Sequence, residues 1–415
     1  MNIRAEDLVN LEKSTLKIAK TKIVPSINSD LDGKPLMRMG TGGKFDNFFL
    51  WDTAFSAIWG RYFLSSLPIE NSLDNLYTAR SEEGFISREY NSKGDPIWHH
   101  NHPIAFAPPL LTWAELSLFE ISSDISRIKR VFPYLKSHHE FCLEKYQGSD
   151  GLFIGDALGS GMDNLKRYPN SWNFRKDGIE LKPEWVHSVY RPHLNKLGPS
   201  HQFWWNSQGR WIDLSSQMAF DSKCLAEMAK ILGFKEELNT FKKQYEDLKA
   251  SINDLCWNED HQFYFDLGYG QHIIRYHIGS YWALLAGVVP KSRIEGFVSH
   301  LSNPKKFKTA VPVPSLAVDD PDFSNDGKYW RGSSWHPTTY MVIKGLKDNG
   351  FSEKAHEISL KCVEANLILF KKTKTFWENL SPIKAEPGNP SQSDFCGWAG
   401  LSSVAIPREF LKIDI

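Results

Sequence analysis

The sequence predicts an all-α protein of the (α/α)6 barrel class, in which an inner ring of helices is enclosed by an outer ring. Two observations favour this class. Helical stretches follow one another along the 415 residues, and strand signals between them are few. Stretches rich in charge also alternate with stretches that are nearly free of it, as expected when half-exposed helices alternate with buried ones. About twelve such helices are expected, enough for six pairs.

The stretches 238–255 and 277–289 show the two kinds of helix side by side. In 238–255 apolar residues recur three and four positions apart with charges between them, which is typical of an amphipathic helix. The stretch 277–289 has no Asp, Glu, Lys or Arg and stops before Pro290, so we expect it on the inside of the barrel. The other helices are expected at 6–20, 48–64, 70–80, 106–122, 126–146, 211–233, 291–302, 335–344, 352–371 and 396–406. Short hairpin strands are expected within 151–157 and 262–268.

Four long stretches without a helical period separate these helices, namely 21–47, 147–210, 303–334 and 375–395. Loops of this length in a compact protein are usually functional. All four contain Gly, Trp or paired polar residues. We therefore expect one domain, 1–415, with its loops gathered at one mouth of the barrel and with 147–210 forming a lid.

The charge balance limits the class of partner. Lys and Arg together number 49, as do Asp and Glu, so the basic surface expected of a nucleic-acid or anionic-membrane binder is absent. The five cysteines form no CxxC pair, which favours buried free thiols in a reducing compartment. No apolar run resembles a signal peptide or a membrane span. We expect a cytoplasmic protein that binds a small molecule, and its oligomeric state stays open.

The content of aromatic residues is 13%, and it includes 15 Trp. Many Trp lie in polar, loop-like stretches such as "PIWHHNHP", "QFWWNSQGRW", "KYWRGSSWHP" and "TFWENLSP". Core packing accounts for some of them. Trp beside Asp, Asn, His and Arg also indicates a concave site that stacks on flat ligand faces and hydrogen-bonds their rims.

Several kinds of site are not supported by the sequence. It has no GxSxG elbow and no P-loop, and "GTGGKF" at 40–45 fails the GxGxxG pattern because its sixth residue is Phe45. The histidines of "WHHNHP" match no zinc spacing, and no HExxH occurs. We expect no metal and no cofactor, and we expect these histidines to hydrogen-bond a polar ligand or the next helix.

Two carboxyl groups in loop-like sequence are conspicuous, Asp163 in "GSGMDN" and Glu378 in "FWENLSP". A glycosidase needs such a pair, one carboxyl protonated to donate to the departing oxygen and one ionised to activate water. We expect the apolar neighbour Met162 to raise the pKa of Asp163 and the polar loop around Glu378 to keep that carboxyl ionised. Taken singly, each is more readily a solvated loop carboxylate, so the pair depends on its context.

That context is a resemblance to a known group of enzymes. Seven motifs carry it, in chain order: "FFLWDTAF" (48–55), "DNLYTARSEEGFISRE" (74–89), "GSGMDNLKR" (159–167), "IGSYWALLAGVVP" (278–290), "YWRGSSWHPTTYMV" (329–342), "FWENLSP" (376–382) and "FCGWAGLSSVAI" (395–406). They resemble the trehalase-like and glucosidase-like glycoside hydrolases, and among these glycoside hydrolase family 63 with its bacterial glycerate-glycoside hydrolases.

The resemblance implies an (α/α)6 barrel that hydrolyses an α-glycosidic bond from the non-reducing end with inversion. It implies that Asp163 is the general acid and Glu378 the general base. Two departures leave the substrate open. Leu165, Lys166 and Arg167 follow "GMDN" where relatives often have Ser-Pro-Arg. "YWRG" continues with 333–336, "SSWH", rather than with Pro-Val/Thr-Trp-Pro.

The resemblance also implies substrate-binding roles. Trp51 and Asp52 would hold the non-reducing sugar, although Asp52 also suits a helix N-terminus. Tyr329, Trp330 and Arg331 would form another wall, with an ion pair as the alternative for Arg331. Other expected contacts are Phe45, Trp98, His99, Asn164, Trp335, Trp377, Gln392 and Trp398. For Trp377 and Trp398, packing in the core is the alternative. Arg88, Lys166 and Arg167 could meet an anionic aglycone such as glycerate, or be solvated charges.

Two other functions stay open at this point. A sugar 2-epimerase uses the same barrel with histidine chemistry, for which His99, His102 and His336 are candidates. A carbohydrate-binding protein without activity is the second, although a binder has no need of both Asp163 and Glu378. Released monosaccharide, an isomer of unchanged mass, and binding without reaction distinguish the three functions.

Overall fold

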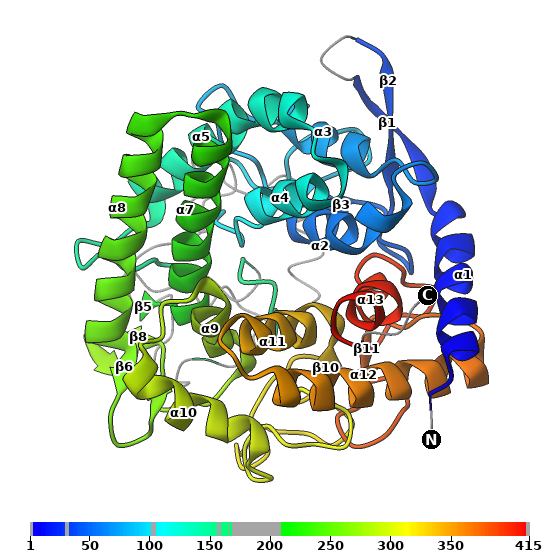
Figure 1. Ribbon diagram of the computed structural model, residues 1–415, viewed down its shortest axis with the longest axis vertical. Coiled ribbons are helices and arrows are strands. Elements are labelled where there is room, and N and C mark those ends of the chain that lie inside the picture. Colours follow the sequence, from blue (N-terminus) through cyan, green and yellow to red (C-terminus); the bar gives the residue numbers. More distant parts are fainter. Residues whose placement is uncertain are drawn as a thin grey trace.

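The computed structural model describes residues 3–29, 33–100, 105–155, 159–165, 167 and 209–411. Within these ranges the helices form the expected (α/α)6 barrel (Figure 1). The inner ring consists of α2 (Leu50–Gly60), α4 (Leu111–Ser122), α7 (Ile212–Leu232), α9 (Trp282–Ala286), α11 (His336–Asp348) and α13 (Ile406–Phe410). The outer ring consists of α1 (Ala5–Lys20), α3 (Ile69–Thr78), α5 (Ile125–Tyr146), α8 (Lys235–Ser251), α10 (Lys291–Ser299) and α12 (Ser352–Thr373).

Burial explains why the charge pattern alternates along the chain. Every residue of the inner helices α2 and α9 is buried, whereas the outer helix α8 buries Phe241 and Leu248 and exposes most of its charged residues. Neighbouring inner helices pack on one another around the ring, and the π-helical turn Leu401–Ala405 before α13 closes it against α2 and α11. The prediction of inner and outer helices is confirmed.

Some helix boundaries differ from the expectation. Residues 106–110 are not helical, and α4 begins at Leu111, because Pro108 and Pro109 each remove an amide hydrogen and Pro109 disfavours a helical residue before it. The stretch 277–289 starts as the 3-10 turn Ile278–Tyr281 and ends at Gly287, whose φ is +74°. The last helical stretch lies later than expected and reaches Phe410.

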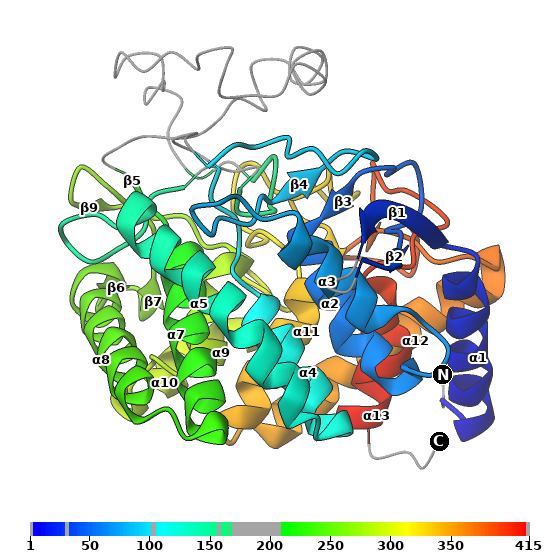
Figure 2. The same ribbon diagram turned by 90° about the horizontal axis from the view of Figure 1, so that it is seen from above.

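The strands are short. Most of them lie within the loops on one side of the barrel, where they pair one loop segment with another (Figure 2). The stretch 21–47, expected to be irregular, contains a hairpin of β1 (Ile23–Ser29) and β2 (Pro35–Met39). The antiparallel pairs β3–β4 (Phe48–Phe49 with Glu89–Tyr90) and β10–β11 (Ser334–Trp335 with Asn379–Leu380) lie next to the site described below. The remaining strands are β5 (Gly209–Arg210), β6 (Trp257–Asn258), β7 (Phe263–Tyr264), β8 (Leu267–Gly268) and β9 (Gln271–His272). Most of the expected lid, 147–210, lies outside the described residues.

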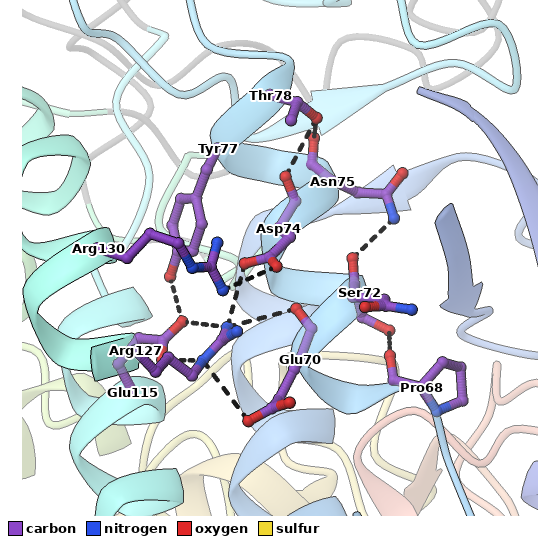
Figure 3. Close-up of polar contacts among 11 residues, drawn as sticks. Pro68, Glu70, Ser72, Asp74, Asn75, Tyr77, Thr78, Glu115, Arg127 and Arg130 are labelled. Carbon is purple, nitrogen blue, oxygen red and sulfur yellow. Dashed lines mark hydrogen bonds and ion pairs between the residues drawn. The ribbon is translucent and has the colours of Figure 1, made fainter. Parts of the chain in front are cut away.

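Buried ion pairs join the two rings. Figure 3 shows Arg127 of α5 donating to both carboxylate oxygens of Glu115 in α4, each at 2.7 Å. The Tyr77 hydroxyl of α3 donates to the same carboxylate at 2.8 Å, and Asp74 of α3 pairs with Arg127 and Arg130. Glu115 is fully buried, so these partners replace the water that the carboxylate loses. The buried charge of Glu115 in the inner helix α4 is thereby stabilised.

The first and last helices also meet. Arg408 of α13 donates to both carboxylate oxygens of Glu12 in α1, and Lys371 of α12 pairs with Asp7 of α1. Within the described ranges, no helix is long and apolar enough to cross a membrane. The same residues contain no cluster of three or more His, Cys, Asp or Glu that could hold a metal ion.

Candidate active site

A cavity of about 120 Å³ lies among the loops that join the helices. A single water molecule needs only about 10–15 Å³ of such space, so the cavity has room for a much larger ligand. Among the residues that the structure describes, eight aromatic side chains line it: Phe45, Phe49, Trp51, Trp98, Tyr329, Trp330, Phe395 and Trp398. Four carboxyl groups and one guanidinium of the same described set also line it: Asp52, Glu89, Asp163, Glu378 and Arg88. Such a mixture suits a ligand with flat apolar faces and many hydroxyl groups.

The start of α2 and the β3–β4 pair form one wall of this cavity. Trp51 and Asp52 lie in the first turn of α2. The N–H of Leu50 donates to the Arg88 carbonyl at 3.0 Å, and Phe49 pairs with Glu89 across the two strands. These backbone contacts place Arg88 and Glu89 beside the helix N-terminus that carries Asp52.

Glu89 and Arg88 are held by their neighbours. The Glu89 carboxylate accepts hydrogen bonds from the Asn47 amide at 2.7 Å and from the Trp98 indole at 3.3 Å. The Arg88 guanidinium lies 3.6 Å from the centre of the Trp98 ring, a cation–π contact. The wall therefore presents a guanidinium beside a carboxyl group, Glu89, whose pKa burial raises.

The backbone around Glu378 is fixed by three contacts. Its own N–H donates to the Gln392 carbonyl at 2.9 Å, and its carbonyl accepts from the Trp398 indole at 2.8 Å. The preceding carbonyl, that of Trp377, accepts from Nε2 of His336 at 3.0 Å. The strand β11 begins directly after Glu378, so the residue enters the cavity from a rigid segment.

The carboxylate of Glu378 is fixed as well. Its Oε1 accepts from the Tyr329 hydroxyl at 2.8 Å, and its Oε2 accepts from the N–H of Gln392 at 3.2 Å. Burial raises the pKa of Glu378 to about 7, and the two hydrogen bonds oppose this rise. The expectation that a polar loop keeps this carboxyl fully ionised is wrong. Its neighbours in the chain are polar, but its neighbours in space are aromatic rings, and it is 2% exposed.

Asp52 is also a buried carboxyl, only 6% exposed. Burial raises its pKa well above the usual value, and the charges of Glu378, Asp163 and Glu89 raise it further. The carboxyl thus favours its neutral form in the cavity. It lies at the helix N-terminus, as one of the two interpretations of the sequence expected, and it also faces the cavity.

The loop that carries Asp163 is held first by Gly161 against Trp51. Gly161 has a φ of +76°, which residues with a side chain rarely adopt. A Cβ atom at Gly161 would lie 2.6 Å from Cζ2 of Trp51. Met162 is buried, and its methyl group faces Gly279 of the 3-10 turn rather than the cavity. The apolar contact of this loop at the cavity is therefore made by Gly161 with Trp51.

The same loop is held a second time by Asn164 and a third time by Arg167. Asn164 hydrogen-bonds the backbone of 328–330. The Arg167 side chain is fully buried, pairs with Asp213 and Asp266, and lies 4.1 Å from the centre of the Trp211 ring. Arg167 is thus neither a solvated charge nor part of the cavity lining.

Comparison with known proteins identifies the family. The family model of the mannosylglycerate hydrolase MGH1-like glycoside hydrolase domain matches residues 46–399. The chain belongs to this family. Within the matched range lie all the lining residues named above except Phe45.

Relatives of this glycoside hydrolase are moderately similar. The mannosylglycerate hydrolase of Rubrobacter radiotolerans is 28% identical, over 73% of this chain and 74% of that protein. A probable trehalase of Oryza sativa subsp. japonica is 22% identical, over 89% of this chain and 71% of that protein. An uncharacterized protein of Borreliella burgdorferi is 26% identical, and the match spans 60% of its length.

Solved structures of similar fold include two glycosidases. The GH63 mannosylglycerate hydrolase of Thermus thermophilus in complex with Tris has a TM-score of 0.73 at 17% identity, over 95% of this chain and 99% of that one. Neutral trehalase Nth1 of Saccharomyces cerevisiae has a TM-score of 0.62 at 14% identity, over 96% and 79%. At such identities the likeness shows the fold, the (α/α)6 barrel of the glycoside hydrolases.

Several residues expected to bind substrate in this MGH1-like glycoside hydrolase are not among the lining residues. Asn164 and Arg331 connect two loops, since Nε of Arg331 donates to the Asn164 carbonyl at 3.3 Å. Trp335 stacks behind Trp330 with ring centres 3.9 Å apart and an interplanar angle of 2°. Gln392 contributes its backbone to Glu378. Trp377, Arg167 and His99 also lie outside the lining set, and Lys166 and His102 lie outside the described residues.

The histidine chemistry of an epimerase finds little support at His336. Burial lowers the pKa of His336 to about 4, so the ring is neutral near pH 7. Its Nε2 must carry the hydrogen that it donates to the Trp377 carbonyl, and Nδ1 then accepts from the Ser402 hydroxyl at 2.7 Å. Both nitrogens have partners in the protein, and His336 does not line the cavity.

Some lining residues were not singled out from the sequence: Phe49, Glu89, Ala107, Pro108 and Phe395. Phe49 and Phe395 lie within the quoted motifs "FFLWDTAF" and "FCGWAGLSSVAI", and proximity to Trp51 and Trp398 was the available signal. Glu89 ends the motif of 74–89, where three other acidic residues precede it. Nothing in the sequence distinguishes Glu89 from them.

Proposed function

We propose that this glycoside hydrolase is an inverting, exo-acting α-glycosidase that acts on a small α-mannoside or α-glucoside. Asp163 is the general acid and Glu378 the general base in this proposal. The observation that carries it is that both carboxyl groups line one cavity although they come from distant parts of the chain. A buried base with a pKa of about 7 also suits proton transfer near neutral pH.

The proposed reaction uses one carboxyl on each side of the sugar. Protonated Asp163 donates its proton to the glycosidic oxygen as that bond breaks. The Glu378 carboxylate takes a proton from a water molecule, which attacks the anomeric carbon from the opposite face. Inversion requires roughly 6.5–9.5 Å between the two carboxyl groups, because the water lies between sugar and base. The two hydrogen bonds to Glu378 keep its carboxylate in one orientation during the proton transfer.

The walls of the cavity support a sugar ligand. Trp51, Trp330 and Trp398 supply flat faces for the C–H side of a sugar ring, and Asp52 and Glu89 supply acceptors for its hydroxyl groups. Among the described lining residues Arg88 alone carries a positive charge. We infer that Arg88 faces the aglycone, so that an anionic aglycone such as glycerate is preferred. The name of the Rubrobacter relative agrees with this preference.

We also propose that residues 1–415 form one catalytic domain. This proposal is supported by an apolar cluster that includes residues from Leu8 in the first helix to Leu411 after the last helix. A lid formed by 147–210 is part of the same proposal.

A substrate panel tests the reaction and its stereochemistry. Glycerate conjugates, α-mannosides, α-glucosides and α-galactosides are incubated with the enzyme, and the anomer first released is followed by NMR. A β-anomer from an α-glycoside is expected. An α-anomer overturns the inverting mechanism, an isomer of unchanged mass indicates epimerisation, and binding without any reaction indicates a carbohydrate-binding protein.

Two substitutions separate the roles of the carboxyl groups. Asp163→Asn and Glu378→Gln are each expected to lower kcat for an alkyl glycoside by about 10²–10⁴-fold. A glycosyl fluoride needs no protonation of its leaving group, so Asp163→Asn should hydrolyse it nearly as fast as the unchanged enzyme while Glu378→Gln should not. Asp260→Asn, at an exposed position, is the control. Equal losses on the fluoride would contradict the assignment.

A further inference from the structure

We propose that Asn164 is a positioning residue for the general base, because it holds Tyr329 where the Tyr329 hydroxyl donates to Glu378. Asn164 does not line the cavity. The inference rests on the proposed function in so far as Glu378 is the base, and it adds a residue that acts through another one.

The side-chain amide of Asn164 brackets Tyr329. Its Nδ2 donates to the Lys328 carbonyl at 3.0 Å, and its Oδ1 accepts from the N–H of Trp330 at 2.8 Å. These are the two peptide groups that flank Tyr329, so one side chain fixes both backbone angles of that residue. Among the short side chains of this size, only an amide offers a donor and an acceptor in this arrangement.

The backbone segment that Asn164 bonds has an unfavourable conformation. Lys328 has a φ of +37° and Tyr329 a φ of +65°. Residues with a side chain rarely adopt this left-handed conformation, and it persists where surrounding contacts impose it. Two consecutive residues share it here. Without the Asn164 amide, the segment is expected to relax toward negative φ, which rotates the Tyr329 side chain.

A rotation of Tyr329 acts directly on the base. The Tyr329 hydroxyl lies 2.8 Å from Oε1 of Glu378 and is buried and protonated, since burial raises its own pKa well above the usual value. Its hydrogen bond stabilises the ionised carboxylate and lowers the pKa of Glu378 against the effect of burial. Loss of this bond therefore leaves Glu378 protonated at neutral pH.

Other charged groups also face Glu378. Asp52 does so from α2, Arg88 and Glu89 line the same cavity at the start of β4, and Asp163 precedes Asn164 in the same loop. The N–H of Gln392 provides the second bond to the carboxylate. A substitution of Asn164 leaves all of these charges in the chain, and the variant that also carries Tyr329→Phe shows whether a change in the titration of Glu378 arises through the Tyr329 bond.

The titration of Glu378 itself tests the proposal. Protein with ¹³C-labelled Glu carboxyl groups is followed by NMR from pH 5 to 10, and the Glu378 signal is the one that Glu378→Gln removes. In Asn164→Ala, Asn164→Leu and Tyr329→Phe the midpoint is expected to rise by about one pH unit, the effect of one charge-assisted hydrogen bond. In Asn164→Ala/Tyr329→Phe it is expected to match Tyr329→Phe, because both changes remove the same bond.

A matched control separates positioning from stability. Asn349, at the end of α11, also donates to two backbone groups, the carbonyls of Leu284 and Gly345 at 3.0 and 2.8 Å. It lies about 20 Å along the helix from His336. Asn349→Ala should lower thermal stability and leave the Glu378 midpoint unchanged. If the Asn164 variants lose stability in the same way with an unchanged midpoint, Asn164 is merely structural and the proposal fails.

The activity profile gives a second readout. With the base midpoint one unit higher, kcat/KM of Asn164→Ala at pH 7 should fall about fivefold, and the loss should vanish above about pH 9. A loss that is equal at all pH values overturns the proposal. The NMR titration needs no substrate, so an enzyme that hydrolyses nothing in the panel would sink the proposed function while Asn164 is still tested.

Discussion

Glu378 combines two opposing influences on one carboxyl group. Burial among aromatic rings favours the neutral form, and the hydroxyl of Tyr329 and the N–H of Gln392 favour the ionised form. The balance puts the pKa of Glu378 at about 7. An acceptor of protons with this pKa is half ionised at neutral pH, so small changes in its surroundings change how much active enzyme is present.

The first prediction concerns the pH dependence of catalysis. In the proposed mechanism Glu378 acts in its ionised form, so kcat/KM should fall about tenfold for each pH unit below 7, and any fall at higher pH reports the ionisation of the proposed acid Asp163. The measurement uses an uncharged alkyl glycoside, which does not itself titrate. A flat profile between pH 5 and 7 would show that another group is the base.

The second prediction concerns stability. A carboxyl whose pKa is raised from 4.5 to about 7 on folding contributes stability below pH 4.5 that is lost as the pH rises through 7. Glu378→Gln removes this loss, because Tyr329 and Gln392 can still bond the uncharged amide. Relative to the unchanged protein, the variant should gain about 3 kcal/mol between pH 4.5 and 8.

Urea unfolding at pH 5 and pH 8 measures that gain. Glu357→Gln is a control at a carboxyl whose pKa Lys354 and Lys361 lower to about 2. That carboxyl is ionised in the folded and the unfolded protein at both pH values, so the effect of the substitution should not change between pH 5 and pH 8. The same difference between Glu378→Gln and the unchanged protein at both pH values would mean that Glu378 does not titrate between them.

At the scale of one element, the loop 159–165 is positioned by tight packing rather than by regular structure. Gly161 lies against the Trp51 indole, Asn164 bonds the backbone of 328–330, and Arg167 follows in a buried ion pair. Three separate contacts thus hold a segment whose described residues form no helix or strand. Asp163 lies in the middle of it.

The third prediction follows from Gly161. Gly161→Ala should destabilise the protein by about 2–4 kcal/mol, the sum of a left-handed φ for Ala and a clash with Trp51. KM should also rise because Trp51 is displaced from the position in which it is proposed to face the sugar. Gly233→Ala is the control, since Gly233 has the same φ of +76° and no atom within 4 Å of the added Cβ. Thermal unfolding should show a smaller loss there, of about 1 kcal/mol.

The sequence predicts elements to different degrees for physical reasons. Helices appear in the sequence because a period of three to four residues repeats over many turns, whereas the two-residue strands β3, β4, β10 and β11 are too short to show alternation. The motif with Asp163 could be recognised in the sequence as a glycine-rich loop with a carboxyl. The contact of Gly161 with Trp51 could not be predicted, because Trp51 lies more than a hundred residues earlier in the chain.

The same limit applies to the environment of each candidate. Glu378 was found as a carboxyl within a motif, yet its ionisation depends on Tyr329 and on rings from other loops. Asn164 was expected to touch the sugar because of its place beside Asp163, whereas in the structure its amide bonds backbone. Residue type and spacing show which groups are available, and tertiary neighbours decide what each group does.

At the scale of the whole molecule, the ring must be closed by contacts between the ends of the chain. Figure 1 shows the first helix, α1, beside α12, which is the last long helix of the chain. Leu11 of α1 packs in an apolar cluster with Leu367, Phe376 and Ala399. Phe376 leads directly into Trp377 and Glu378. The alternation of helices along the sequence predicts the two rings, but no local pattern indicates which residues join the last helix to the first.

The fourth prediction tests that closure. Leu11→Ala should lower the free energy of unfolding by about 2–5 kcal/mol, since Leu11 is 1% exposed and its removal leaves a cavity. Leu16→Ala on the same helix, at a half-buried position, should cost less. Urea unfolding measures both, and an equal cost would show that the cluster around Leu11 contributes little to closing the ring.

The paired rings of Trp330 and Trp335 have a use beyond packing. Two indoles that lie parallel with their centres 3.9 Å apart are in contact face to face, so a ligand that moves Trp330 also changes the surroundings of Trp335. Trp330 also borders the cavity, as do Trp51, Trp98 and Trp398. Intrinsic fluorescence should therefore change when a ligand displaces water from these rings. Candidate sugars can be ranked by titration of a variant that cannot turn them over, without a dye, a label or a coupled assay.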